Sequence, residues 1–224
     1  MGTKYQEAAK LVIKDKLYKP EEALELVKKT STSKFDGAVE VHCHLGIDAS
    51  KGTEQVRSNV SFPHGTGKTK KVVAFVGPNF EKQAEEAGAD IVGNDQLIAE
   101  IASSGKINFD VAVATPDMMP KLAKIAKILG PKGLMPNPKS DTVTTDIKKT
   151  IAELKKGKVN FKSDNTGNVH IAIGRVSFET GKLLENFEKF MDALRRAKPS
   201  SSKGIFIRSC TITSTMGPAV RVSI

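Results

Sequence analysis

Residues 65–69, Gly-Thr-Gly-Lys-Thr, are the first in the chain whose types and order could hold a phosphate group. They match the end of a P-loop, in which backbone amides and a lysine surround the anion. The first glycine of that motif would stand five positions before Gly67, where this chain has Phe62, and an apolar run follows the segment instead of preceding it. Because a P-loop needs a strand before it and a helix after it, a nucleotide-dependent enzyme that uses Lys68 is only an alternative, which NTP binding would test.

Glu40, His42 and His44 lie on the same face of one predicted strand, a spacing that a metal ion could use. No fourth ligand lies nearby in the sequence, and two histidines with a carboxylate on an exposed strand are more often a solvated or RNA-facing surface. The sequence nowhere places a nucleophile beside a base, and the glycine fingerprint of dinucleotide sites is absent after residue 76. We therefore expect neither catalysis nor a bound metal or cofactor.

Lys34 and Phe35 lie in a polar loop near the start of that strand. A base or a ribose could pack on such an exposed ring. The alternative is that Phe35 fills the core where the strand begins.

Hydroxyl side chains alternate near the end of the chain, at Ser209, Thr211 and Thr213, and lead into residues 215–217, Thr-Met-Gly. Hydroxyl groups on a sheet can bind 2′-hydroxyls and phosphates, and a glycine lets backbone amides come close to RNA. An ordinary threonine-rich exposed strand is the alternative.

The loop of residues 129–139, Leu-Gly-Pro-Lys-Gly-Leu-Met-Pro-Asn-Pro-Lys, contains three prolines and two glycines. These residues rigidify a turn that presents Lys132 and Lys139 beside Leu134 and Met135. It is either a preformed contact for RNA or protein or a long connection between two elements.

The elements that position these residues show alternating hydrophobicity at both ends of the chain. Two short helices come first, the second beginning at Pro20. Strands follow at residues 39–45 and 56–62, where apolar and polar residues alternate as in a strand with one solvated face. The pattern returns as strands at residues 159–161 and 169–173, a helix through residues 183–194, and two final strands joined by residues 215–218.

The middle of the chain has a different pattern, with continuous apolar runs at residues 72–76, 91–92 and 111–114. Helical segments follow each run, which predicts a parallel sheet covered on both faces. The clearest helix begins near Pro120 and ends at Gly130, and another spans residues 146–155. The simplest interpretation is a three-layer α/β domain of residues 67–155 inserted into an α+β domain of residues 1–66 and 156–224, with hinges at the glycines of residues 65–67 and at Gly157.

Charge supports a polyanionic partner. The chain has 224 residues with 35 Lys plus Arg against 25 Asp plus Glu, a net charge of +10. Residues 67–155 contain 13 Lys, no Arg and 11 acids, so that +8 and all six arginines belong to the split domain. Because arginine is the better bidentate phosphate ligand, we expect nucleic acid to bind there.

The sequence contains no apolar run of membrane-spanning length and no signal peptide, so we expect a cytoplasmic protein. Its only cysteines, Cys43 and Cys210, lie in apolar strands, where they are expected to act as small core residues.

Residues 130–139, followed by Thr142 and Val143, resemble the signature of the ribosomal protein L-one family. The resemblance covers essentially the whole chain, because further segments match in the same order. They include Phe35-Asp36, residues 45–48, Val56-Arg57, residues 63–68, residues 86–90, residues 114–117, Asp164, Thr166-Gly167 and residues 215–218.

The resemblance implies a split domain like a ferredoxin-like sandwich and an inserted Rossmann-like domain that binds no dinucleotide. It also implies a monomer outside the ribosome that binds large-subunit rRNA in the mobile stalk beside the tRNA exit site, and that assists release of deacylated tRNA. Bacterial family members also repress their own mRNA, so a purely regulatory mRNA repressor is a further alternative.

Carried over position by position, the family's RNA contacts fall on eight residues of this chain: Glu25, Lys34, Phe35, Lys162, Ser209, Thr215, Met216 and Gly217. Two positions depart from the pattern of some relatives. Ala38 replaces a threonine and His44 replaces a lysine, which removes one hydroxyl and leaves a group that is only partly charged near neutral pH.

Overall fold

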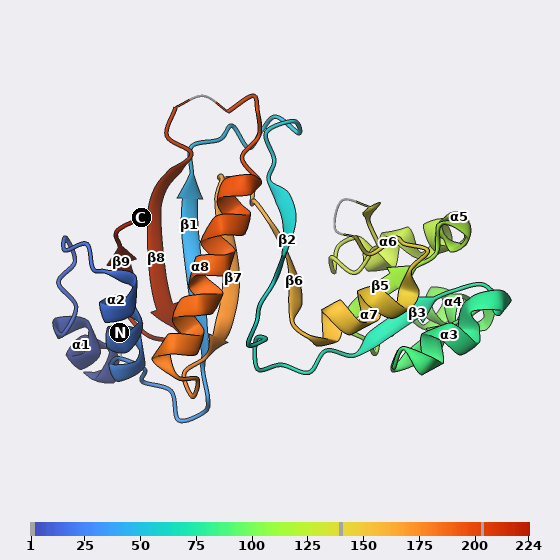
Figure 1. Ribbon diagram of the computed structural model, residues 1–224, viewed down its shortest axis with the longest axis horizontal. Coiled ribbons are helices and arrows are strands. Elements are labelled where there is room, and N and C mark those ends of the chain that lie inside the picture. The colour runs from blue at the N-terminus through green and yellow to red at the C-terminus, as the bar shows by residue number, and fades with distance from the viewer. Residues whose placement is uncertain (1–2, 139–140, 203) are drawn as a thin grey trace. The chain divides into compact units, whose positions relative to one another are not determined.

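The computed structural model describes residues 3–138, 141–202 and 204–224 (Figure 1). The chain divides into two compact units, which are Met1–Gly67 with Val159–Ile224 (unit 1) and Lys68–Lys158 (unit 2). These junctions lie one and three residues after the expected ones. With these bounds unit 2 carries 15 Lys and 11 acids, so unit 1 keeps all six arginines but only +6 of the net charge.

A four-stranded antiparallel sheet forms the centre of unit 1, in the order β7-β1-β8-β9. Its strands are β1 (Ala38–Leu45), β7 (Asn168–Arg175), β8 (Ile207–Ser214) and β9 (Val220–Val222). Along β1, buried and half-buried residues alternate without exception. The sheet therefore has one core face and one face reached by solvent, as the alternating pattern predicts.

The helices α2 (Pro20–Lys29) and α8 (Thr180–Arg196) pack on the core face, and α1 (Thr3–Lys10) precedes them (Figure 1). Helix α2 begins with Pro20 and has two glutamates in its first turn and two lysines in its last, which suits the helix dipole. The rings of Phe161 and Phe190 meet edge to face at 5.5 Å in the core. The side-chain amide of Asn186 is also buried, and it donates to the carbonyls of Gly65 and Ile173 at 3.0 and 2.8 Å.

Two further strands, β2 (Arg57–Ser61) and β6 (Lys158–Lys162), form a separate two-stranded sheet. Gly65, Gly67 and Gly157, the expected hinge glycines, all have positive φ. That conformation is open to glycine at little cost.

Unit 2 contains a parallel sheet in the order β4-β3-β5, formed by β3 (Val72–Phe75), β4 (Ile91–Gly93) and β5 (Val111–Ala114). Val73 and Phe75 belong to one hydrophobic cluster, and Val72 and Ala74 belong to another on the opposite face. The sheet is thus buried on both faces, as its continuous apolar strands predict. Its helical elements are η1 (Pro78–Phe80), α3 (Glu81–Glu86), α4 (Asp95–Ser104), η2 (Pro116–Met118), α5 (Met119–Leu122), η3 (Ala123–Ile125), α6 (Ala126–Leu129) and α7 (Ile147–Lys155).

One expectation for unit 2 is wrong in detail. The helix predicted from Pro120 to Leu129 is interrupted by the 3₁₀ turn η3, although Leu122, Ile125 and Leu129 are fully buried as their spacing requires. In the following loop, Leu134 and Met135 pack against the same cluster and Lys132 is exposed. Lys139 lies outside the described residues.

Cys43 and Cys210 face each other across β1 and β8, with their sulfur atoms 3.5 Å apart, and both are buried. The contact with Cys210 and burial raise the pKa of the Cys43 thiol, which therefore stays protonated. Both act as core residues, as expected.

Candidate nucleic-acid interface

Side chains from β1, β7 and β8 line most of the solvent-facing side of the unit 1 sheet, and none of them is buried. We call this set the open face. It consists of Ala38, Glu40, His42, His44, Asn168, His170, Ala172, Ser209, Thr211 and Thr213. Ser209 pairs with His44 and Thr211 with His42, so the alternating hydroxyls of β8 lie beside the histidines of β1.

Two loops meet at one end of the open face, residues 31–37 before β1 and residues 215–218 after β8. We call them the loop pair. The Thr215 amide donates to the Ala38 carbonyl at 2.9 Å, and the Ala38 amide donates to the Thr215 hydroxyl at 2.9 Å. Thr32 donates to the carbonyl of Met216 at 3.4 Å. The structure thus brings together two sequence-predicted segments that are about 180 residues apart.

Phe35 is 62% exposed, so it does not fill the core. Its backbone is nevertheless held, because Ser33 donates to its carbonyl at 2.9 Å and Asp36 accepts from the Ser177 amide and hydroxyl at 3.0 and 2.8 Å. Arg175 donates to the Asp36 carbonyl at 2.8 Å. A large apolar ring is therefore presented to solvent on a fixed backbone.

Met216 is the second exposed apolar residue of the loop pair, with 74% of its surface accessible. Its φ of 65° lies in the left-handed region, which costs a residue with a Cβ about 1–2 kcal/mol. A Cβ on the next residue, Gly217, would overlap the hydroxyl of Ser214 and would force that side chain to move. Strain and exposure at one position are typical of a functional contact rather than of packing.

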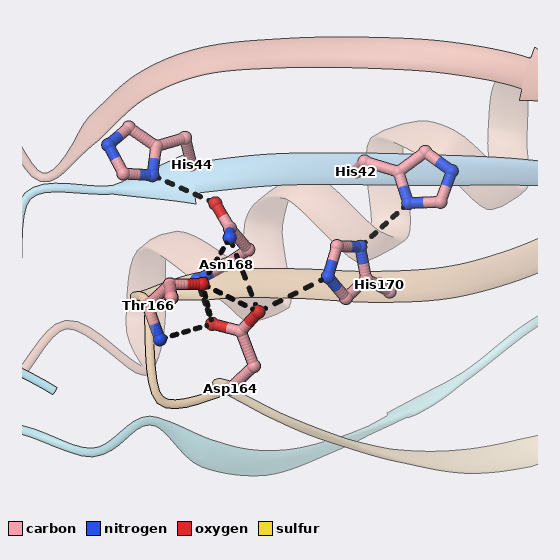
Figure 2. Close-up of polar contacts among 6 residues, drawn as sticks. All are labelled: His42, His44, Asp164, Thr166, Asn168 and His170. Atoms are coloured by element: carbon pink, nitrogen blue, oxygen red, sulfur yellow. Dashed lines mark hydrogen bonds and ion pairs between the residues drawn. The ribbon is translucent and has the colours of Figure 1, made fainter.

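Asp164 organises the opposite end of the open face, in the turn between β6 and β7 (Figure 2). It accepts from the backbone amides of Asn168 and Thr166 at 2.7 and 2.9 Å and from the Thr166 hydroxyl. The amide of Asn168, followed by the Thr166 hydroxyl, holds the pKa of Asp164 well below its ordinary value, against partial desolvation. The residue is a carboxylate at all physiological pH values.

The three histidines of the open face are tied to this turn (Figure 2). Asn168 uses its side-chain amide as donor to Thr166 and Asp164, so its carbonyl oxygen accepts from His44 Nδ1 at 2.8 Å. His170 Nε2 lies 3.5 Å from Asp164, and His170 Nδ1 contacts His42 Nδ1 at 2.7 Å. His42 Nε2 in turn lies 3.7 Å from Glu40.

The eight residues carried over from the resemblance are not equally close together. Lys34, Phe35, Thr215, Met216 and Gly217 lie on the loop pair, and Ser209 lies on the open face next to His44. Glu25 is exposed on α2, and Lys162 is exposed at the end of β6, two residues before Asp164. Sequence reasoning missed His170 and Asn168, whose signal was the period-two alternation of β7.

Other candidate sites gain no support. Residues 65–69 lead into β3 and not into a helix. Within the described parts of the chain, no three His, Cys, Asp or Glu side chains converge to hold a metal ion. No helix among the described residues is long and apolar enough to cross a membrane.

The model of the Ribosomal protein L1p/L10e family matches residues 27–218. The chain belongs to this family. This is the same L-one family that the sequence motifs resemble. The matched residues include the open face and both loops of the loop pair. The protein is therefore a large-subunit ribosomal protein that binds rRNA in the cytoplasm, and its family is structural rather than enzymatic.

Proposed function

We propose that this ribosomal protein holds the rRNA of the mobile stalk beside the tRNA exit site, and that it assists release of deacylated tRNA from that site. We propose unit 1 as the RNA-binding domain, a ferredoxin-like sandwich, and unit 2 as a Rossmann-like insertion. Repression of the protein's own mRNA would use the same surface, since an mRNA element that imitates the rRNA site would meet the same side chains.

The loop pair is the observation that carries this proposal. Phe35 and Met216 are exposed on backbones that hydrogen bonds hold in place, and Met216 is held in a strained conformation. Exposed apolar side chains on a rigid backbone lose little conformational entropy when a base or ribose packs on them. The two residues therefore suit recognition of RNA shape.

Polar residues on the loop pair, on the open face and on neighbouring elements complete the contact. Lys34 and Lys162, with neighbouring arginines, neutralise phosphates, while Ser209 and Thr215 offer hydroxyls to riboses. Gly217 lets the backbone approach the RNA closely, and Glu25 accepts hydrogen bonds from RNA donors at the edge.

The test is a binding titration of the full chain against a transcript of the rRNA stalk and a scrambled transcript, at several salt concentrations. Met216→Asp should weaken rRNA binding by tenfold or more, about 1.4 kcal/mol or above, because it removes an apolar contact and adds a negative charge beside phosphates. Ile205→Asp is the matched control, since Ile205 is 77% exposed in unit 1 but outside the loop pair.

Equal binding of both transcripts by the wild-type chain, or equal losses in the two variants, would contradict the proposal. A separate titration with the protein's own mRNA leader tests repression. Binding of that leader much more tightly than the rRNA transcript would favour a purely regulatory role.

A further inference from the structure

His42 and His170 form a connected pair on the open face, and Figure 2 shows Asp164 at the outer end of His170. Glu40 lies at the outer end of His42. Their Nδ1 atoms are 2.7 Å apart, although the residues are 128 positions apart in the chain. The side chain of His170 is 54% exposed, so a ligand on this face can reach it. Nothing in the RNA contact described above uses this pair.

The proton count of the pair follows from its geometry. In the neutral pair one Nδ1–H donates to the other Nδ1, and the donating ring leaves its Nε2 without a proton, facing a carboxylate. When this Nε2 takes up one proton from the solvent, both Nε2 atoms carry a hydrogen that faces a carboxylate. The hydrogen bond between the two Nδ1 atoms is kept. A second proton would put hydrogens on both Nδ1 atoms and break that bond. The pair is therefore built to accept a single proton.

The surroundings of the pair decide what that proton does. Glu40 on β1 and Asp164 before β7 are its negative neighbours, His44 lies on the same face, and Thr211 on β8 is neutral. Arg221 on β9 pairs with Thr211 and so adds a fixed positive charge on this face. Burial and then His170 lower the pKa of His42, while Glu40 opposes that shift. The two rings thus share the first added proton. His42 disfavours a positive charge of its own when His170 is already charged.

We propose that His42 and His170 together take up one proton when RNA binds, and that the resulting imidazolium contacts a backbone phosphate. This inference rests on the proposed function, because it needs RNA on the open face. The two carboxylates beside the pair repel a phosphate, and one proton on the pair offsets one of their two negative charges. The Nε2–H groups lie 3.5 and 3.7 Å from those carboxylates, which is longer than a strong hydrogen bond, so an Nε2–H can also donate to a phosphate oxygen. RNA affinity therefore rises as pH falls through the histidine range.

The experiment measures rRNA binding by the full chain from pH 7.5 to pH 6.0 at constant ionic strength. Calorimetry in two buffers of different ionisation enthalpy counts the protons taken up. With at most one linked proton, affinity should rise about three- to tenfold over this range. The variant His42→Gln with His170→Gln should lose more than half of the rise and of the proton uptake. His64→Gln is the matched control. His64 is a histidine of unit 1 that contacts a carboxylate, Glu185, at 2.8 Å, but it lies outside the open face.

The outcomes separate this inference from the proposed function. If the wild-type chain prefers the stalk transcript at pH 7.5 but takes up no proton, only the inference fails. It also fails if the double variant keeps more than half of the pH dependence, which would assign the proton to His44 or to the RNA. If the wild-type chain does not distinguish the stalk transcript from a scrambled one, both proposals fail.

Discussion

Met216 and Gly217 show how much can depend on single residues in a turn. Met216 has a left-handed backbone, and Gly217 has no room for a Cβ beside the Ser214 hydroxyl. The same turn accepts hydrogen bonds from Thr32 in the loop before β1 and from the Ala38 amide at the start of β1, and its Thr215 amide donates to the Ala38 carbonyl. A change at Gly217 should therefore affect both the local fold and the RNA contact.

We predict that Gly217→Ala lowers the free energy of unfolding by about 1–3 kcal/mol, since the added methyl group overlaps Ser214. Urea denaturation measures this change. Gly52→Ala is the control, because nothing lies within 4 Å of a Cβ at Gly52. Equal stability of the two variants would show that the turn relaxes without cost.

At the scale of elements, the sequence predicted the strands of both units well, because alternating and continuous apolar patterns reflect one-sided and two-sided burial. It could not predict that His42 meets His170, since a contact 128 residues apart depends on the register of two strands. It also left the environment of Phe35 open, because an aromatic at the start of a strand is compatible with a core or an exposed position. The 3₁₀ turn at residues 123–125 has no local breaker residue to signal it.

The β6–β7 turn is an element held mainly by one carboxylate. The folded-state pKa of Asp164 is lowered, so its contribution to stability is present above its unfolded pKa and is lost as pH falls towards the folded value. We predict that Asp164→Asn lowers stability at pH 7, because an amide accepts fewer of the donors around it. We further predict that the variant loses less stability than the wild type between pH 5 and pH 3.

Denaturant titrations at these pH values test the prediction. Asp15→Asn, at an exposed position near the N-terminus, should behave like the wild type. If the free energy of unfolding fell more steeply with decreasing pH in Asp164→Asn than in the wild type, the role assigned to this carboxylate would be contradicted.

At the scale of the whole molecule, the two units have separate hydrophobic clusters. Every residue of the cluster around α2 and α8 belongs to unit 1, and the two clusters on either side of the β3 sheet belong to unit 2. The observed boundary between the units assigns Lys156 and Lys158 to unit 2, whereas the predicted boundary placed them in the split domain. Unit 1 therefore has a net charge of +6 rather than +8. Both units therefore carry a positive net charge, and the proposed RNA site on unit 1 depends on the loop pair and the open face as well as on charge.

We predict that a shortened chain, with Gly67 joined to Val159 by a flexible glycine–serine linker, folds cooperatively and binds the stalk transcript within about tenfold of the full chain. The reason is that unit 1 keeps its own core, all six arginines and every residue proposed to contact RNA. Circular dichroism with urea measures folding, and a titration at two salt concentrations measures affinity. The plot of log affinity against log salt should become only slightly shallower, because the lost lysines contribute attraction without specific contacts. A shortened chain that folds but no longer distinguishes the stalk transcript from a scrambled one would show that unit 2 takes part in recognition.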